Sequence, residues 1–141
     1  MTASIPRLTG LLETALYVSD LAISEAFYSR VLGLETFLRD SRMCAMGVPG
    51  ATVLLLFHRG GSVQPSTTPA GTIPAHDGRG TLHLAFAIPR NALDAWAAHL
   101  ARERIAIESR ITWPAGGTSV YFRDPDQHSV ELATPGLWPS Y

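Results

Sequence analysis

Cysteine is almost absent from this chain of 141 residues, in which Cys44 is the only one. One cysteine can form neither an internal disulfide nor a cysteine-based zinc site, and such scarcity is typical of a protein in a reducing cytoplasm. The longest apolar run, residues 53–57, is far below the roughly 20 residues of a membrane-spanning helix. Residues 1–10 hold no apolar stretch that would indicate a secretory signal. We therefore expect a cytoplasmic protein with no membrane segment.

Charge of neither sign predominates, because 11 basic residues stand against 12 acidic ones. The net charge of -1 provides no basic surface for nucleic acid or for an anionic membrane. The length is sufficient for one well-buried domain and too short for two ordinary ones. Nucleic acid and an anionic membrane are therefore not the expected partners.

The first half of the chain has the pattern of a strand, a helix and three strands. Residues 12–18 alternate as in a strand, Asp20 can cap a helix over residues 21–32, and Gly33 suits its left-handed end. Three short apolar stretches follow, at residues 35–38, 42–46 and 52–58. The predicted order is β-α-β-β-β.

The second half repeats this order. Residues 81–88 predict a strand, and Leu93, Trp96 and Leu100 lie on one face of the helix that follows. Further strands are predicted at residues 105–108, 118–123 and 129–134. Pro125 favours a tight turn between the last two strands, and His128 in that turn is expected to face solvent. The repetition predicts a duplicated unit.

The repetition divides the chain into one domain with two tails. We expect an N-terminal tail at residues 1–10, a single domain at 11–135 and a C-terminal tail at 136–141. Within the domain, module one covers residues 11–59 and module two covers 81–135. The linker at 60–80 holds five glycines and three prolines without periodicity, which is typical of a loop. His76 in this linker is expected to be a solvated loop histidine.

Two sequence stretches carry a resemblance to a known family. The opening ETALYVSDLAISEAFYSRVLGLE and the closing SVYFRDPDQHSVEL, together with the repeated unit, resemble the vicinal oxygen chelate superfamily. This superfamily includes glyoxalases, bleomycin resistance proteins, extradiol dioxygenases and fosfomycin resistance enzymes. The resemblance implies an α+β fold in which two tandem βαβββ modules form a curved mixed sheet around a cupped groove, in a homodimer with a divalent metal in the groove.

The resemblance also implies the metal ligands. Carried onto this sequence, they are Glu13 and His83 on the first strand of each half, and Glu131 on the last strand. A fourth ligand of some relatives would fall on Leu54 or Leu55, which cannot bind a metal.

Each of the three ligand positions also has a simpler interpretation. Glu13 could be exposed at a strand start, His83 could be a hydrogen-bonded core residue, and Glu131 could pair with Arg123 or Arg110. A carboxylate or imidazole within an apolar strand is costly to bury unless it is paired or bound to a metal. The coincidence of all three residues at the family's positions favours the metal site.

The ligand types limit which metal ions and which class of reaction we expect. One imidazole and two carboxylates suit Mn²⁺, Ni²⁺, Co²⁺, Fe²⁺ or Zn²⁺. A carboxylate ligand can also take up a proton, so Glu131 or Glu13 is predicted to move the proton beside the carbonyl of a vicinally oxygenated substrate, through a metal-stabilised enolate. His58, Tyr17, Tyr121 and Arg123 are the predicted substrate-binding residues.

Three other functions stay open on the sequence. A metal-free small-molecule binding protein of the bleomycin resistance type is the first alternative. An extradiol dioxygenase or a fosfomycin-type thiol transferase is the second. The presence of Glu13 where many relatives have histidine makes ring cleavage less favoured.

Overall fold

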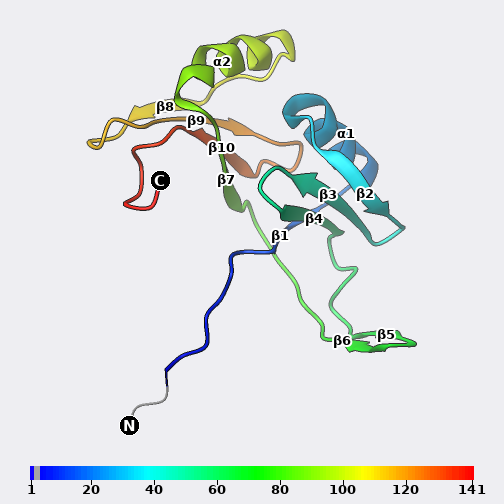
Figure 1. Cartoon of the computed structure of the whole chain (residues 1–141). Coiled ribbons are helices and arrows are strands. Elements are labelled where there is room, and N and C mark those ends of the chain that lie inside the picture. The colour runs from blue at the N-terminus through cyan, green and yellow to red at the C-terminus, as the bar shows by residue number, and fades with distance from the viewer. Residues whose placement is uncertain (2–3) are drawn as a thin grey trace.

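The computed structural model describes residue 1 and residues 4–141 (Figure 1). Residues 2 and 3, which belong to the predicted N-terminal tail, lie outside the described part. No helix within the described part is long and apolar enough to cross a membrane. Figure 1 shows the remaining tail extending away from two groups of strands, each accompanied by one helix.

The first module follows the predicted order. Its elements are β1 (Glu13–Val18), α1 (Leu21–Leu32), β2 (Glu35–Arg39), β3 (Met43–Val48) and β4 (Thr52–His58). Helix α1 begins where the Asp20 side chain accepts a hydrogen bond from the Ile23 backbone N–H, and ends at Gly33 with φ of 69°. Both ends of this helix are therefore set by local capping residues.

The second module repeats the arrangement. Its elements are β7 (His83–Ala87), a 3₁₀ turn (Arg90–Ala92), α2 (Leu93–Arg102), β8 (Ser109–Thr112), β9 (Thr118–Arg123) and β10 (Ser129–Ala133). The sheets have matching orders, β1-β4-β3-β2 and β7-β10-β9-β8, each with one parallel and two antiparallel pairs. These two mixed sheets confirm the predicted α+β fold of tandem modules.

Equivalent positions in the two modules follow from the strand register. Glu13 lies opposite Val53 in the first sheet, and His83 lies opposite Ser129 in the second. Two residues further along, Leu55 therefore occupies the place that Glu131 has in the second module. Leu55, rather than Leu54, is the apolar residue at the fourth ligand position.

The two sheets share one apolar core. Side chains of β1 and β4 and of β9 and β10 belong to the same buried cluster, to which they contribute Leu16, Val18, Leu54, Leu56, Val120, Phe122, Val130 and Leu132. We call the sheet faces that carry these residues the inner faces. Because side chains alternate along a strand, Glu13, His83 and Glu131 lie on the opposite, outer faces. The outer faces of the two sheets turn away from the common core.

Two sequence expectations about local structure were wrong. The strand predicted at residues 105–108 begins later, at Ser109, because the Ile105 N–H still bonds the Leu100 carbonyl and Arg104 has a positive φ of 59°. The linker contains a small hairpin of β5 (Ser66–Thr68) and β6 (Gly71–Ile73), which lies apart from both sheets in Figure 1. Its strands are too short to show periodicity in the sequence.

His128 is buried, which corrects the expectation that it faces solvent. Its Nδ1 accepts a hydrogen bond from the Leu82 backbone N–H at 2.8 Å, and its Nε2 lies 2.8 Å from the Tyr17 carbonyl oxygen. An Nδ1 that accepts requires the ring proton on Nε2, which then donates to Tyr17. The ring thus links the end of β1 in the first module to the residue before β7 in the second module.

The turn before His128 is held by a buried carboxylate. Asp124 accepts hydrogen bonds from the backbone N–H groups of Asp126 and His128 and from the hydroxyl of Tyr28, at 2.8 to 2.9 Å. Burial raises the pKa of Asp124 above its usual value. These bonds keep Gln127 at a positive φ of 66°, a conformation that glycine adopts more readily.

Candidate functional site

The second module brings His83 and Glu131 together on the outer face of its sheet. His83 opens β7 and Glu131 lies in the middle of the neighbouring parallel strand β10. The His83 Nε2 and Glu131 Oε2 atoms are 3.3 Å apart. The Glu131 residue is 4% exposed, whereas the His83 side chain is 52% exposed. The pair is therefore anchored in the sheet at Glu131 and open to solvent at His83.

Each member of the pair also forms a hydrogen bond to another group. His83 Nδ1 lies 2.9 Å from the Ser129 carbonyl oxygen, which can only accept, so Nδ1 carries the proton and donates. In the neutral ring, Nε2 then presents a lone pair to the Glu131 carboxylate. Two acceptor atoms that face each other at 3.3 Å require a proton or a cation between or beside them.

The other oxygen of Glu131 is bound by a side-chain relay. The Ser119 hydroxyl donates to Glu131 Oε1, and the Trp113 indole N–H donates to Ser119 Oγ at 2.7 Å. Ser119 is fully buried. Sequence reasoning missed Ser119 and Trp113. The alternation of β9, which places Ser119 on the same face as Tyr121, is the signal that could have identified Ser119.

Tyr121 and Arg123 lie beside this pair, but they differ in how far their polar groups are already bonded within the protein. Tyr121 is paired with Glu131 across β9 and β10, and its ring centre is 6.3 Å from that of His83. Burial and the charge of Glu131 raise the pKa of Tyr121, so its phenol stays protonated at neutral pH. Arg123 forms two bonds to Glu108, at 2.6 and 3.0 Å, and one to the Gln127 carbonyl. Its guanidinium is already engaged by the protein.

Glu13 lies on the outer face of the first sheet, away from His83 and Glu131. It lines a hollow of about 480 Å³, which we call the first-module hollow, with Thr14, Ala15, Tyr17, Arg42, Met43, Leu55, Phe57, Ile73 and His76. Among the described residues, no three His, Cys, Asp or Glu side chains lie close enough together to hold a metal ion. One chain therefore assembles two of the three predicted ligands.

His58 is placed apart from both groups. It ends β4 with an exposed side chain, and it shares the parity of the inner-face residues Leu54 and Leu56. The lining of the first-module hollow does not include it. The other predicted substrate-binding residue of this module, Tyr17, is buried in the wall of the hollow.

His76 is a residue of the first-module hollow, which corrects the expectation of a solvated loop histidine. The Tyr17 hydroxyl oxygen is 2.7 Å from His76 Nδ1, and the His76 ring packs edge-on to Phe57 with ring centres 4.4 Å apart. The His76 backbone N–H also bonds the Ser62 carbonyl oxygen at 2.9 Å. Gly78 lies so close to Tyr17 that a Cβ atom would be 2.2 Å from the ring. The linker is thus fastened across the hollow.

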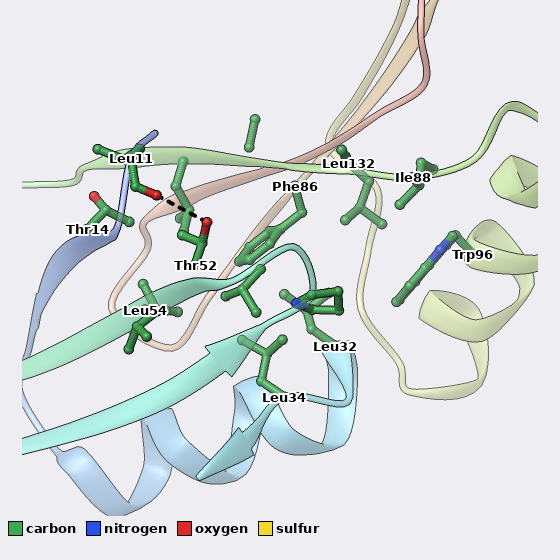
Figure 2. A pocket seen from close by; sticks show the side chains of 16 residues that line it. Leu11, Thr14, Leu32, Leu34, Thr52, Leu54, Phe86, Ile88, Trp96 and Leu132 are labelled. Atoms are coloured by element: carbon green, nitrogen blue, oxygen red, sulfur yellow. Dashed lines mark hydrogen bonds between the residues drawn. The ribbon is translucent and has the colours of Figure 1, made fainter. Parts of the chain in front are cut away.

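A second hollow, of about 350 Å³, lies between the inner faces of the two modules (Figure 2). Figure 2 shows Leu54 and Leu34 on one side of it and Phe86 and Leu132 on the other. No acidic or basic side chain is among its lining residues. It has no group that could bind a metal or transfer a proton, so the polar chemistry belongs to the outer faces.

The fold and the His83–Glu131 pair define a class of protein: two tandem βαβββ modules that carry polar side chains on their outer sheet faces. The chain belongs to the Glyoxalase/Bleomycin resistance protein/Dioxygenase superfamily, whose family model matches residues 10–132. This match confirms the resemblance seen in the sequence.

Solved structures agree with this assignment. A lactoylglutathione lyase from Agrobacterium tumefaciens is 34% identical, with a TM-score of 0.86 and coverage of 95% of this chain and 99% of that one. A glyoxalase/dioxygenase from Nostoc punctiforme is 25% identical, with a TM-score of 0.67 and coverage of 95% and 98%. A fosfomycin resistance protein from Listeria monocytogenes, at 23% identity, has a TM-score of 0.67 and coverage of 93% and 97%, and shows the shared fold.

Proposed function

We propose that this protein is a divalent-metal-dependent enzyme that moves a proton on a small substrate with two neighbouring oxygens. The observation that carries the proposal is the close approach of His83 Nε2 to Glu131 Oε2, at 3.3 Å. The similarity to a lactoylglutathione lyase at 34% identity supports the reaction class. The single, buried Cys44 is compatible with work in a reducing cytoplasm.

The residues present fit a divalent metal. Nitrogen and oxygen ligands about 2.1 Å from one ion lie about 3.0 to 3.4 Å from each other, and the His83–Glu131 distance falls in this range. The Ser129 carbonyl and the Ser119 hydroxyl hold the two ligands from behind, as outer-shell partners of metal ligands do. A bound Mn²⁺, Ni²⁺, Co²⁺, Fe²⁺ or Zn²⁺ ion would supply Lewis acidity toward the two substrate oxygens.

Glu131 is the proposed acid and base. Ser119 fixes the Oε1 atom, so Oε2 is assigned both roles: it would bind the metal and, when it detaches, take the proton from the carbon beside the substrate carbonyl and return it. The protonated Tyr121 phenol, next to Glu131 in the sheet, can donate a hydrogen bond to a substrate oxygen. Glu13 is the second carboxylate that the proposal assigns to proton movement and to the metal.

A second copy of the chain is proposed to supply Glu13 to this pair. Within one chain, Glu13 and the pair lie on outer faces that turn away from the same core. A two-fold dimer can bring the outer face of the first module of one copy against the outer face of the second module of the other. Such a homodimer would contain two complete grooves between the copies, which we call cups, each with Glu13 from one copy and His83 and Glu131 from the other.

Small-molecule binding without a metal is the second candidate function. The observation that favours it is Leu55, an apolar residue where the second module has Glu131. Metal content of protein purified without added metal or chelator separates the two candidates. One equivalent per chain supports the enzyme. Metal-free protein that also fails to take up metal on titration supports the binding protein.

A Ser119→Ala variant tests the proposed metal centre by removing the hydroxyl that holds the ligand Glu131 in place. Without the hydroxyl, Glu131 Oε1 loses its donor, so we expect the affinity for Mn²⁺ or Zn²⁺ to fall about 10- to 100-fold. Titration calorimetry on apoprotein measures the change. Thr118→Ser is the matched control in the neighbouring position, and its affinity is expected to equal that of the native chain. Equal affinity for the Ser119→Ala variant would contradict the role of the relay.

A further inference from the structure

Arg42 is a cation that the proposed chemistry does not use. Its guanidinium Cζ lies 5.8 Å from the centre of the Phe57 ring, and one terminal nitrogen donates to Ser62 Oγ at 3.4 Å. The residue is half-buried in the wall of the first-module hollow. The ion pairs found in the described part of the chain do not include Arg42. Arg123, in contrast, is paired with Glu108.

The remainder of the hollow is largely apolar and includes aromatic rings. Tyr17 stacks on Phe57 with ring centres 5.9 Å apart, and the His76 ring lies 5.8 Å from Tyr17. Met43, Leu55 and Ile73 complete the wall. Aromatic and aliphatic surface of this kind favours a flat apolar group, which can contact ring faces and edges at small entropic cost.

His76 adds a hydrogen-bond donor to this wall. Burial and the charge of Asp77 raise the pKa of Tyr17, so its phenol stays protonated and can donate to His76 Nδ1. In the tautomer whose Nδ1 accepts this bond, the His76 ring carries its proton on Nε2. Arg42 and His76 therefore both offer donors, which suit an anionic group.

Arg42 and Glu13 lie at opposite ends of the hollow. Glu13 is paired with Val53, and Tyr17, four residues further, is paired with Phe57, against which Arg42 packs. Four residues of a strand span about 13 Å. A molecule bound along β1 could thus place its reacting oxygens near Glu13 and an anionic end near Arg42.

We infer that the first-module hollow binds the remote end of the substrate, and that this end is a carboxylate on a flat apolar body, with Arg42 as the residue that selects the acid. The inference rests on the proposed function, because it assigns one end of the cup to the reacting oxygens of the substrate and the other end to its carboxylate. It places specificity at the Arg42 end of the cup and the chemistry at the end that holds Glu13, His83 and Glu131. It also requires that the acid binds without the metal.

The test uses 3-phenylpropionate as the probe, with 3-phenylpropionamide as its neutral counterpart and propionate as the acid without the ring. Binding to the full-length native protein is measured by calorimetry and by ligand-observed NMR, in the presence of a chelator. We expect the acid to bind about tenfold more tightly than the amide, since a charge-assisted hydrogen bond is lost in the amide. Propionate is expected to bind more weakly than 3-phenylpropionate.

The Arg42→Gln variant should abolish the preference for the acid and leave amide binding unchanged. The Arg42→Lys variant, which keeps the charge, should retain part of the preference and covers the case in which the glutamine variant fails to fold. Arg79→Gln is the matched control, because Arg79 is an exposed arginine of the linker, and its acid preference should equal that of the native chain. Equal binding of acid and amide, no binding of the acid at millimolar concentration, or an unchanged preference in both Arg42 variants would overturn the inference.

Metal titrations on the same proteins separate this inference from the proposed function. If the acid binds only with added Mn²⁺ and loses binding in Glu131→Ala, the carboxylate goes to the metal, and the inference fails while the metal centre stands. If no metal binds but the preference for the acid still depends on Arg42, the proposed enzyme fails and the anion site stands.

Discussion

A Glu131→Ala variant is expected to lose stoichiometric metal. Glu131 supplies one ligand oxygen and, in the proposed reaction, the proton-accepting atom, and its loss leaves no proposed ligand except His83 on that sheet face. The expected change is from one ion per chain in the native protein to none retained after desalting. Elemental analysis of protein purified without chelator measures the metal content. Turnover of any substrate with vicinal oxygens should disappear together with the metal.

Glu35→Ala is the control for this variant, because Glu35 is an exposed carboxylate at the start of β2 in the other module. Its metal content should equal that of the native chain. If the Glu131→Ala variant stays folded and keeps one ion per chain, Glu131 is not a ligand, and the metal centre has to be sought elsewhere.

A His128→Ala variant is expected to be the most destabilised of the histidine variants. The change opens a cavity and leaves the part-buried Leu82 N–H and the buried Tyr17 carbonyl without partners. An unsatisfied buried group costs about 1 to 3 kcal/mol, so the free energy of unfolding should fall by about 2 to 6 kcal/mol. Urea denaturation followed by circular dichroism measures the loss.

His58→Ala provides the comparison, because His58 is exposed at a strand end. Surface substitutions of this kind change stability by about 0.5 kcal/mol or less. If the two variants unfold at the same urea concentration, the His128 bridge contributes nothing to the association of the modules.

Local signals account for the parts of the fold that the sequence predicted well. Asp20 and Gly33 fix both ends of α1, and alternation locates β1, β4 and β9 to within a residue. The turn residues Pro125 and Asp126 identify the final hairpin. These features depend on neighbours a few residues away, which a single sequence displays directly.

Non-local contacts account for the parts that the sequence did not predict. His128 in isolation has the pattern of a turn histidine, and only its packing between Leu82 and Tyr17 buries it. The Ser119 contact to Glu131 depends on the register of β9 with β10. His76 lies in a segment without periodicity, and its contact with Tyr17 spans 59 positions of the chain.

The candidate site shows the same division between features set by local sequence and features set by non-local packing. The sequence located His83 and Glu131, and the structure brings them together. The sequence could not show that Glu13 lies on a different outer face, because that depends on which sides of the two sheets form the core. Neither the alternation nor the family resemblance contains this information.

The claim that one cup combines Glu13 of one copy with His83 and Glu131 of another can be tested with mixed dimers. Glu13→Ala and Glu131→Ala chains are co-expressed with different affinity tags, and the heterodimer is isolated through both tags. Each variant alone should bind no metal stoichiometrically. In the heterodimer, one cup carries both substitutions and the other carries neither, so we predict one bound ion per dimer. A heterodimer that binds no metal, while the native dimer binds two ions, would contradict the account.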